Sequence, residues 1–216
     1  MTTDANAKKI PDEVRRAVEQ GRDIQKAVRN ITLKALTRGE LDQGAIRKVT
    51  GDVVKAVQEA ATVRGVRAKE VVAEAIAGVD EALAHAAQAL KLSIEEAAGR
   101  AGKFSREDLA KARESLKNLE GDFLDTLRET ARASGSTMSA ILDDLIKHAQ
   151  ASGTAVGRQL QQMSGLSGRM AEAGRAQFEA GTRAAMSSTA MMARIASGVL
   201  AGIADSLDTK SKNRPS

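Results

Sequence analysis

Apolar residues recur along the chain at alternating steps of four and three, the spacing that places side chains on one side of an α-helix. Four runs of this kind cover residues 14–31, 46–63, 109–127 and 138–163. Because an amphipathic helix gains most of its stability by burying its apolar face, each run needs a partner. We therefore predict an all-α protein, an extended bundle of long amphipathic helices with coiled-coil-like heptad stripes. The longest run consists of Val72, Ile76, Val79, Leu83, Ala86, Leu90, Ile94, Ala97, Ala101 and Phe104.

Proline and glycine mark several expected helix ends. Pro11 suits the first turn of a helix, so residues 1–10 are expected to form a disordered leader. Glycine adopts the left-handed conformation easily, and helices are predicted to stop at Gly39, Gly65 and Gly135. The helical bundle should then span residues 11–163.

Two capping sequences occur in the chain, and only one of them clearly predicts the start of a helix. Ser105 can cap a helix, with Phe104 and Leu109 placed to contact each other across its first turn, which predicts a helix start there. A second capping sequence begins at Ser93, but the longest apolar run passes straight through it. Whether the chain breaks near Leu92 is left open by the sequence.

A weak internal similarity relates two segments at an offset of 70 residues. Residues 52–76 align without gaps to residues 122–146, and apolar positions mostly match apolar positions. Each unit would be a helix, a glycine turn and a helix, which is an αα-hairpin. Duplication and chance similarity between helical sequences of biased composition remain equal alternatives.

Composition narrows the fold class in the same direction. The 216 residues include three Phe, no Trp and no Tyr, with 40 Ala and two Pro near the ends. A mixed or all-β core needs more aromatic and β-branched residues, whereas an alanine-rich, proline-free interior favours helices. The apolar runs are thin, so we expect the helices to complete their core in a homo-oligomer or on an apolar surface.

The net charge of +5 hides three blocks of alternating sign. Residues 1–70 carry 15 basic and 10 acidic side chains, residues 71–144 carry 9 and 14, and residues 145–216 carry 9 and 4. Packing of the basic blocks beside the acidic one is the favoured interpretation. A pI near 9.6 leaves non-specific nucleic acid as an alternative partner. Basic clusters are only pairs, however, and no Tyr or Trp is present to stack on bases.

No catalytic, metal or cofactor site is predicted. The absence of Cys excludes disulfides and thiolate chemistry and makes the cytoplasm the default location. His85 and His148 have no second histidine one turn away, as a helical metal site would require. The carboxylate pairs at 95–96 and 143–144 diverge by about 100° on a helix. We expect a protein that is not an enzyme.

The charge-poor segment near the C-terminus is the main functional candidate. Arg194 is the only charged residue between 184 and 204, and Gly198 and Gly202 have the spacing of packed membrane helices. A central arginine costs about 2.5 to 3.5 kcal/mol in a membrane, so no transmembrane span is expected. Instead, residues 184–207 should form an apolar helix, whose burial or exposure stays open. The expected surface or partner contacts are Met186, Met191, Met192, Ile195, Val199, Leu200, Ile203 and Leu207.

The segments on either side of this helix have weaker signals. Residues 164–183 are rich in Gly and Ala, and each interior glycine costs about 1 kcal/mol of helix stability relative to alanine. We expect a pliable helix or a hinge there. Residues 208–216 are expected to be a disordered tail.

One stretch carries a resemblance to a known family. Ala176-Gln177-Phe178-Glu179-Ala180, in an Ala/Gln/Met-rich part of a cysteine-free helical chain, resembles phasins, bacterial proteins that coat polyhydroxyalkanoate granules. Residues 127–132 and 153–158 are similar to helical proteobacterial proteins of unknown function. The phasin resemblance implies an oligomeric helical protein adsorbed to a storage granule through an amphipathic face.

The sequence thus predicts a non-enzymatic helical scaffold or surface coat, located in the cytoplasm or at a granule or membrane surface. Its contact would be a storage granule, a lipid surface or partner helices. Two alternatives are a nucleoid- or polyanion-associated basic protein and a cytosolic assembly adaptor.

Overall fold

A computed structural model describes residues 9–38, 41–62, 67–99, 104, 106–163 and 188–212. These residues form helices and connections, with no strand among them, so the predicted all-α bundle is confirmed. A further helical segment covers residues 155–163. The helices are α2 (Lys9–Gln20), α3 (Ile24–Leu36), α4 (Gln43–Thr62), α5 (Ala68–Gly99), α6 (Arg106–Arg132), α7 (Ser136–Ser152) and α9 (Ser188–Lys212).

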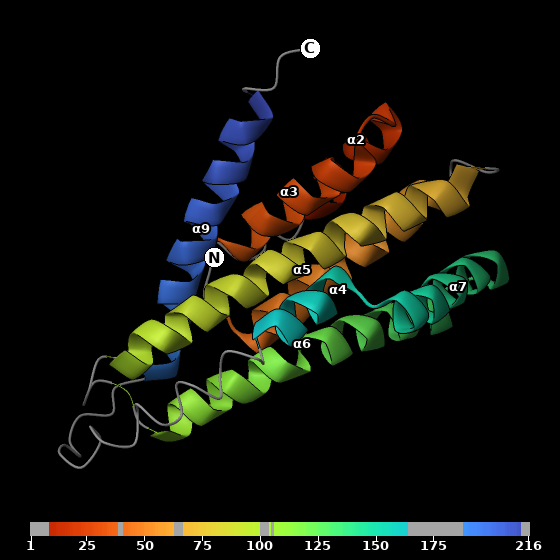
Figure 1. The fold of residues 1–216 in the computed structure, drawn as a ribbon. Coiled ribbons are helices and arrows are strands. Elements are labelled where there is room, and N and C mark those ends of the chain that lie inside the picture. Colours follow the sequence, from red (N-terminus) through yellow and green to blue (C-terminus); the bar gives the residue numbers. More distant parts are fainter. Residues whose placement is uncertain are drawn as a thin grey trace.

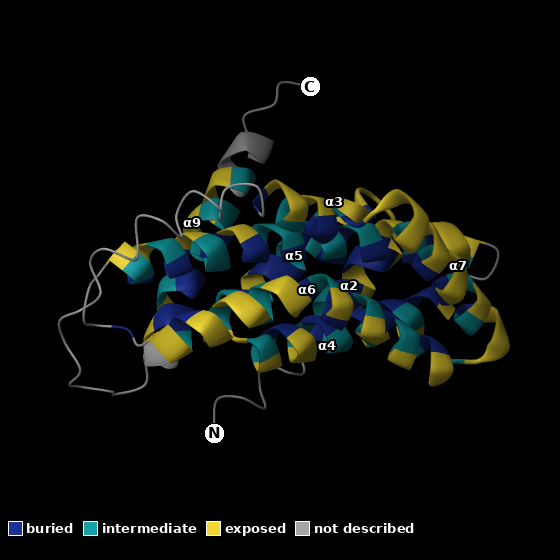
Figure 2. Cartoon of the chain, turned by 60° about the horizontal axis from the view of Figure 1, so that its bottom comes forward, coloured by how far each residue is buried: buried dark blue, intermediate teal, exposed yellow. Residues whose placement is uncertain are grey.

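The 32-residue helix α5 is the centre of the bundle. It contacts α3, α4, α6, α7 and α9, while α2 packs on α4, and α6 packs on α4 and α7. Figure 1 shows α5 and α6 running along the length of the molecule, with α9 inclined to them at one edge. Buried residues follow the inward faces of the helices (Figure 2). The longest predicted apolar run therefore marks the central core helix.

Helix α5 is continuous through the second capping sequence. Ser93 is buried, and its hydroxyl donates a hydrogen bond to the carbonyl oxygen of Ala89 at 2.8 Å. The chain therefore does not break near Leu92. The other predicted start is confirmed, because α6 begins at Arg106. Phe104 and Leu109 lie in one buried cluster, although Ser105 itself is outside the described residues.

The apolar run at 14–31 is two helices rather than one. Gly21 and Asp23 have positive φ angles of 65° and 47°, and the chain leaves the helical conformation between Gln20 and Ile24. The apolar spacing continues across this break because both helices bury it, but α2 does so on α4 and α3 mainly on α5. Spacing alone does not reveal such a turn.

The run at 138–163 is also broken. Helix α7 ends at Ser152, Gly153 has a φ of 76°, and the helical segment 155–163 follows. Gly135 precedes α7 with a φ of −67°, so it starts a helix and is not a left-handed stop. Gly39 and Gly65 lie outside the described residues, beyond the ends of α3 and α4.

The predicted segment boundaries need two corrections. Helix α2 begins at Lys9, and Ile10 belongs to the core, so residues 9 and 10 are not part of a disordered leader. Helix α9 continues through Lys212, five residues past the predicted end at 207. Residues 164–183 lie outside the described residues. The α4–α5 and α6–α7 pairs are both αα-hairpins, but their origin by duplication stays a prediction.

Ion pairs join the basic N-terminal block to the acidic middle block. Arg29 pairs with Glu81 at 3.4 Å, and Lys69 pairs with Asp144 at 2.7 Å. Asp122, which is buried, accepts hydrogen bonds from Arg47 at 2.6 Å and from the Gln43 side chain at 2.7 Å. The favoured interpretation of the charge pattern is thus confirmed for these described residues of the first two blocks.

A glycine sets the distance between α3 and α5. A Cβ atom on Gly78 would collide with the carbonyl oxygen of Gln25 and lie about 3.0 Å from the amide nitrogen of Arg29. Because both of these are backbone atoms of α3, no side-chain rotation relieves the contact. Glycine therefore permits the backbones of two core helices to approach closely at this crossing.

Candidate contact surface

Two hydrogen bonds join helix α9 to the connection between α3 and α4. The amide of Leu41 donates a hydrogen bond to the carbonyl oxygen of Ala193 at 3.2 Å, and the Ser197 hydroxyl donates to the carbonyl oxygen of Thr37 at 3.1 Å. Small side chains on this face, such as Ala196, allow the close approach. These contacts fix which side of α9 faces the bundle.

The inner face of α9 contains two of the residues predicted to make external contacts. Met192 is 4% exposed and packs with Ile94, Phe104 and Leu109, and Leu200 is fully buried in the main core. The prediction of a surface contact is therefore wrong for Met192 and Leu200 in this structure. Their large apolar side chains anchor α9 to the bundle instead.

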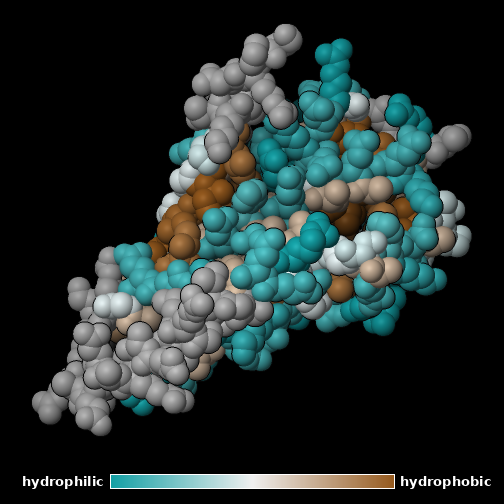
Figure 3. Space-filling view, in the orientation of Figure 1, coloured by the Kyte–Doolittle hydropathy of each residue, from teal (hydrophilic) through white to brown (hydrophobic). Residues whose placement is uncertain are grey.

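The remaining described candidates lie along the side of α9 that the bundle covers only in part. Met191 is 48% exposed, and the other four side chains are partly buried against the core. Figure 3 shows hydrophobic residues gathered in a strip along α9. Met186 lies outside the described residues. We call the following set the α9 flank: Met191, Ile195, Val199, Ile203 and Leu207.

The flank becomes less supported toward its C-terminal end. Between 201 and 207 no residue of α9 is fully buried, whereas Ala196 and Leu200 are. Figures 1 and 2 show the reason, since this end of α9 projects past the neighbouring helices. Ile203 and Leu207 therefore contact the core but are only partly covered, which leaves part of each side chain for an external contact.

A carboxylate on α5 holds the helical segment 155–163. The Asp80 carboxylate accepts hydrogen bonds from the backbone amides of Ala155 at 2.6 Å and Val156 at 2.9 Å. Burial raises the pKa of Asp80 above its usual value, although these two amides act in the opposite direction. Asp80 thus satisfies two amides that the first turn of a helix leaves without partners.

Thr154 completes this cap with help from α6. Its hydroxyl oxygen accepts the amide of Gly157 at 2.8 Å, and the hydroxyl donates to a carboxylate oxygen of Glu120 at 2.5 Å. A Cβ on Gly157 would overlap the Glu120 carboxylate, so any larger residue here would require Glu120 to move and disturb its hydrogen bond with Thr154. The cluster was not predicted from the sequence. Its only local signal is a threonine directly after Gly153, which is a common way to begin a helix.

The two histidines occupy unrelated places. His85 is half-buried on α5, where burial, and secondarily the positive charge of Arg29, lower its pKa, while Glu81 opposes the shift. His148 is exposed on α7. In the parts of the chain that the structure describes, no three His, Cys, Asp or Glu side chains are grouped to hold a metal ion.

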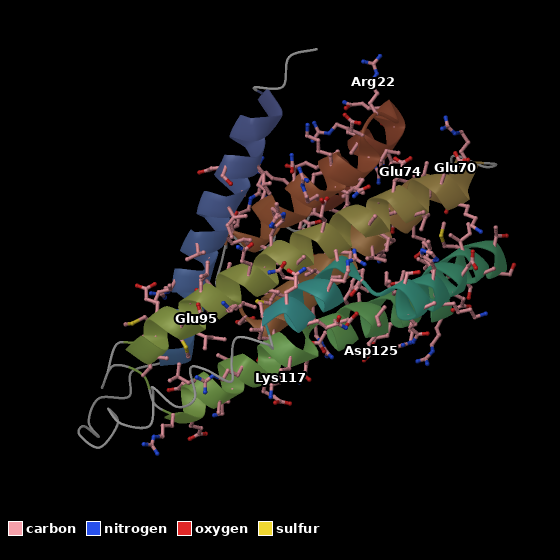
Figure 4. The ribbon with its side chains drawn as sticks, viewed as in Figure 1. Arg22, Glu70, Glu74, Glu95, Lys117 and Asp125 are labelled. Carbon is pink, nitrogen blue, oxygen red and sulfur yellow. The ribbon has the colours of Figure 1, made fainter. Side chains whose placement is uncertain are left out.

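One carboxylate of each adjacent pair, 95–96 and 143–144, forms an ion pair with a lysine. Glu95 pairs with Lys91 at 2.7 Å, while Asp144 pairs with Lys69 on another helix. Figure 4 shows that its labelled side chains do not converge; Lys117 and Asp125, for example, lie at separate places along α6. Among the described residues, these polar contacts join neighbouring helices or, as for Lys91 and Glu95, lie within a single helix.

A small cavity lies between α5, α6 and the starts of α4 and α9. Its volume is about 70 Å³, and polar groups of Ser93, Lys111 and Ser115 line it beside apolar residues such as Leu90 and Met192. Water takes about 30 Å³ per molecule in the liquid. Ligand pockets usually measure about 300 to 1,000 Å³, so this cavity suits water and not a cofactor.

Within the described ranges, no helix has both the length and the apolarity needed to cross a membrane. A family of unknown function (DUF6781) matches the chain over residues 1–209. No curated protein and no solved structure matches it. The matched range contains α2 to α7 and the α9 flank, so the flank lies inside the region that the family model covers.

Proposed function

We propose that this chain, which belongs to the family of unknown function DUF6781, is a non-enzymatic helical scaffold or coat protein that binds through the α9 flank. The contact is an apolar surface, either a storage granule or lipid, or partner helices. The observation that carries the proposal is an apolar strip left partly uncovered on a helix whose adjoining face is anchored in the core.

The anchoring of α9 supports this role. Met192 and Leu200 hold one face of the helix in the bundle, and two hydrogen bonds fix its rotation. The flank is thereby presented in a constant direction. Met191 adds a flexible thioether side chain that adapts to irregular apolar surfaces. Such an arrangement suits peripheral adsorption, in which only the flank enters the apolar phase.

The polar interior supports a structural role as well. Asp80, Glu120 and Asp122 each accept hydrogen bonds from another part of the chain. These contacts position helices and leave little for a substrate to bind. The phasin-like stretch favours a polyhydroxyalkanoate granule among the apolar surfaces.

A nucleic-acid role has less support. Arg29, Arg47 and Lys69 are engaged with carboxylates of the acidic block, which reduces the positive charge available to phosphates. We therefore retain it only as an alternative, along with the cytosolic adaptor.

Flotation of the full-length protein tests the coat function. The protein is mixed with phosphatidylcholine vesicles or polyhydroxyalkanoate granules and centrifuged through a density gradient. We expect wild type to float and the Met191→Gln/Ile195→Gln variant to remain at the bottom. Leu92→Gln is the matched control, because Leu92 is also a large apolar residue, is 41% exposed and lies on α5.

Circular dichroism at increasing temperature shows whether the variants keep their fold. The proposal is overturned if the folded flank variant behaves as wild type does, both in flotation and in oligomeric mass. Loss of flotation in both the flank variant and Leu92→Gln also contradicts it, since binding would then not depend on α9.

A further inference from the structure

Helix α9 has two methionines side by side in the sequence, and the bundle covers only one of them. The Met191 side chain is 48% exposed, whereas Met192 is 4% exposed and packs with Phe104. The other two methionines among the described residues, Met138 and Met163, are each 8% exposed. Within the described ranges, Met191 is therefore the methionine that a solute in water reaches most readily.

The chemistry available to an exposed methionine is oxidation of its thioether sulfur to a sulfoxide. One oxygen of hydrogen peroxide bonds to Sδ, the O–O bond breaks, and the second oxygen leaves with both hydrogen atoms as water. The sulfur loses two electrons, and the peroxide gains them. The product carries a polar S=O group in place of an apolar sulfur, and methionine sulfoxide reductases return it to methionine.

An oxygen on the Met191 sulfur changes the α9 flank at its most exposed position. The other four residues of the flank are partly buried and carry aliphatic side chains, which peroxide does not oxidise. At the free surface of the protein, water solvates the sulfoxide oxygen. Entry into an apolar phase removes that water and offers no hydrogen-bond donor in its place, which costs free energy. Oxidation of Met191 therefore opposes adsorption through the flank.

The same reaction at the neighbouring methionine would have a different result. Met192 anchors α9 in the cluster with Ile94, Phe104 and Leu109, so an oxygen on its sulfur would lie among apolar side chains and weaken the attachment of the helix. Burial protects Met192, and peroxide modifies the surface of α9 before it reaches the anchor. Oxidation at Met191 thus alters the contact surface while the bundle stays folded.

We propose that Met191 is a peroxide-sensitive modification site, and that its sulfoxide releases the α9 flank from an apolar surface. Hydrogen peroxide is the oxidant, and reduction of the sulfoxide restores the contact. This inference rests on the proposed function, since it regulates the contact that the α9 flank makes. Two properties are required of the protein: oxidation must favour Met191 over the buried methionines, and oxidation at Met191 must weaken binding.

Peptide mapping of the full-length protein after peroxide treatment tests the first property. Trypsin cleaves after Arg183 and Arg194, so Met191 and Met192 lie in one peptide, and its fragment ions assign the added oxygen to one or the other. We expect Met191 to be oxidised about tenfold faster than Met192 and Met138, because susceptibility follows exposure. Equal rates at Met191 and Met192 overturn the proposal.

Flotation with phosphatidylcholine vesicles or polyhydroxyalkanoate granules tests the second property. Each protein is compared with its own untreated sample, after catalase has removed the peroxide. Oxidation should lower the ratio of bound to free wild type about tenfold, and a sulfoxide reductase should restore it. Met191→Leu, which has no sulfur at this position, should give the same ratio before and after peroxide. Met138→Leu is the matched control and should respond as wild type does, because it removes a buried methionine on α7.

The outcomes separate this inference from the proposed function. If peroxide releases Met191→Leu as it releases wild type, another residue carries the effect and the proposal is overturned. Loss of helical circular dichroism in step with loss of flotation overturns it too, because the cause would be unfolding. Wild type that floats equally before and after complete oxidation of Met191 excludes the switch and leaves the coat function standing. Untreated wild type that floats with neither vesicles nor granules contradicts the coat function itself.

Discussion

Helices α5 and α9 are both rich in alanine and apolar residues, yet they have opposite places in the molecule. Helix α5 contacts α3, α4, α6, α7 and α9, and positions on several of its sides are buried. Helix α9 contacts chiefly α5, with smaller contacts to α3 and α6, and buries one narrow face. The two helices have similar compositions, so the number of neighbouring helices decides whether an apolar helix lies in the core or at the surface.

The same contrast between α5 and α9 is seen at one glycine of each helix. On α5, Gly78 is required because another backbone lies against it, whereas Gly198 on α9 has open space around it. The residue type is identical and both positions are helical. What differs is whether a neighbour within the chain already occupies the space.

The strongest test of this contrast is the pair Gly78→Leu and Gly198→Leu. We expect Gly78→Leu to lower the free energy of unfolding by about 3 kcal/mol, because the new side chain forces α3 away from α5. Gly198→Leu should leave stability unchanged or raise it by up to about 1 kcal/mol through helix propensity. Urea unfolding followed by circular dichroism at low protein concentration measures both. Similar losses in the two variants would remove the distinction between α5 and α9.

A second test concerns α5 as an anchor for other segments. Asp80→Ala leaves the amides of Ala155 and Val156 without acceptors and should cost about 2 kcal/mol. Hydrogen exchange at these two amides should accelerate more than elsewhere. Asp52→Ala, which removes an exposed pair with Lys48, is the control and should cost no more than about 0.5 kcal/mol. Equal effects would mean that the cap on the 155–163 segment contributes little.

The smallest expected effect is a pH dependence carried by His85. Burial lowers the pKa of His85 in the folded protein below its ordinary value of 6.5, so folding favours the neutral ring. This contribution is complete above about pH 6.5 and is lost as the pH falls through the lowered pKa of the folded state. Unfolding free energies of wild type and His85→Gln, compared at about pH 8 and pH 5, isolate it. The control is His148→Gln, at an exposed position on α7.

If His85→Gln keeps the same difference between the two pH values as wild type, the partial burial of His85 has no thermodynamic consequence. Helix α5 would then be less closely packed against α3 at this position than at Gly78.

Apolar spacing predicted the fold class and the buried sides of the long helices, because burial on a neighbouring helix produces that spacing directly. It did not predict the breaks at Gly21 to Asp23 and at Gly153. There the apolar spacing continues while the backbone changes direction, and the left-handed φ of Asp23 has no strong signal in its residue type.

The candidate surface was predicted only in outline. The apolar segment predicted the contact helix, α9. Spacing could not show that Met192 and Leu200 face inward, because the rotation of α9 is fixed by hydrogen bonds to Thr37 and Leu41. Asp80 carried no local signal at all. The amides that it binds are 75 and 76 residues away in the chain, and only the folded arrangement brings them together.

The hydrogen bond between Ser197 and Thr37 joins residues that are 160 positions apart. During synthesis, Thr37 leaves the ribosome long before Ser197 has been translated. The edge of α5 that α9 will cover therefore stays without this neighbour until the last part of the chain has been made. Contacts between such distant residues also form late in folding, because closing a long loop costs entropy before any contact repays it. We therefore expect α9 to dock last, onto a bundle formed by the preceding helices.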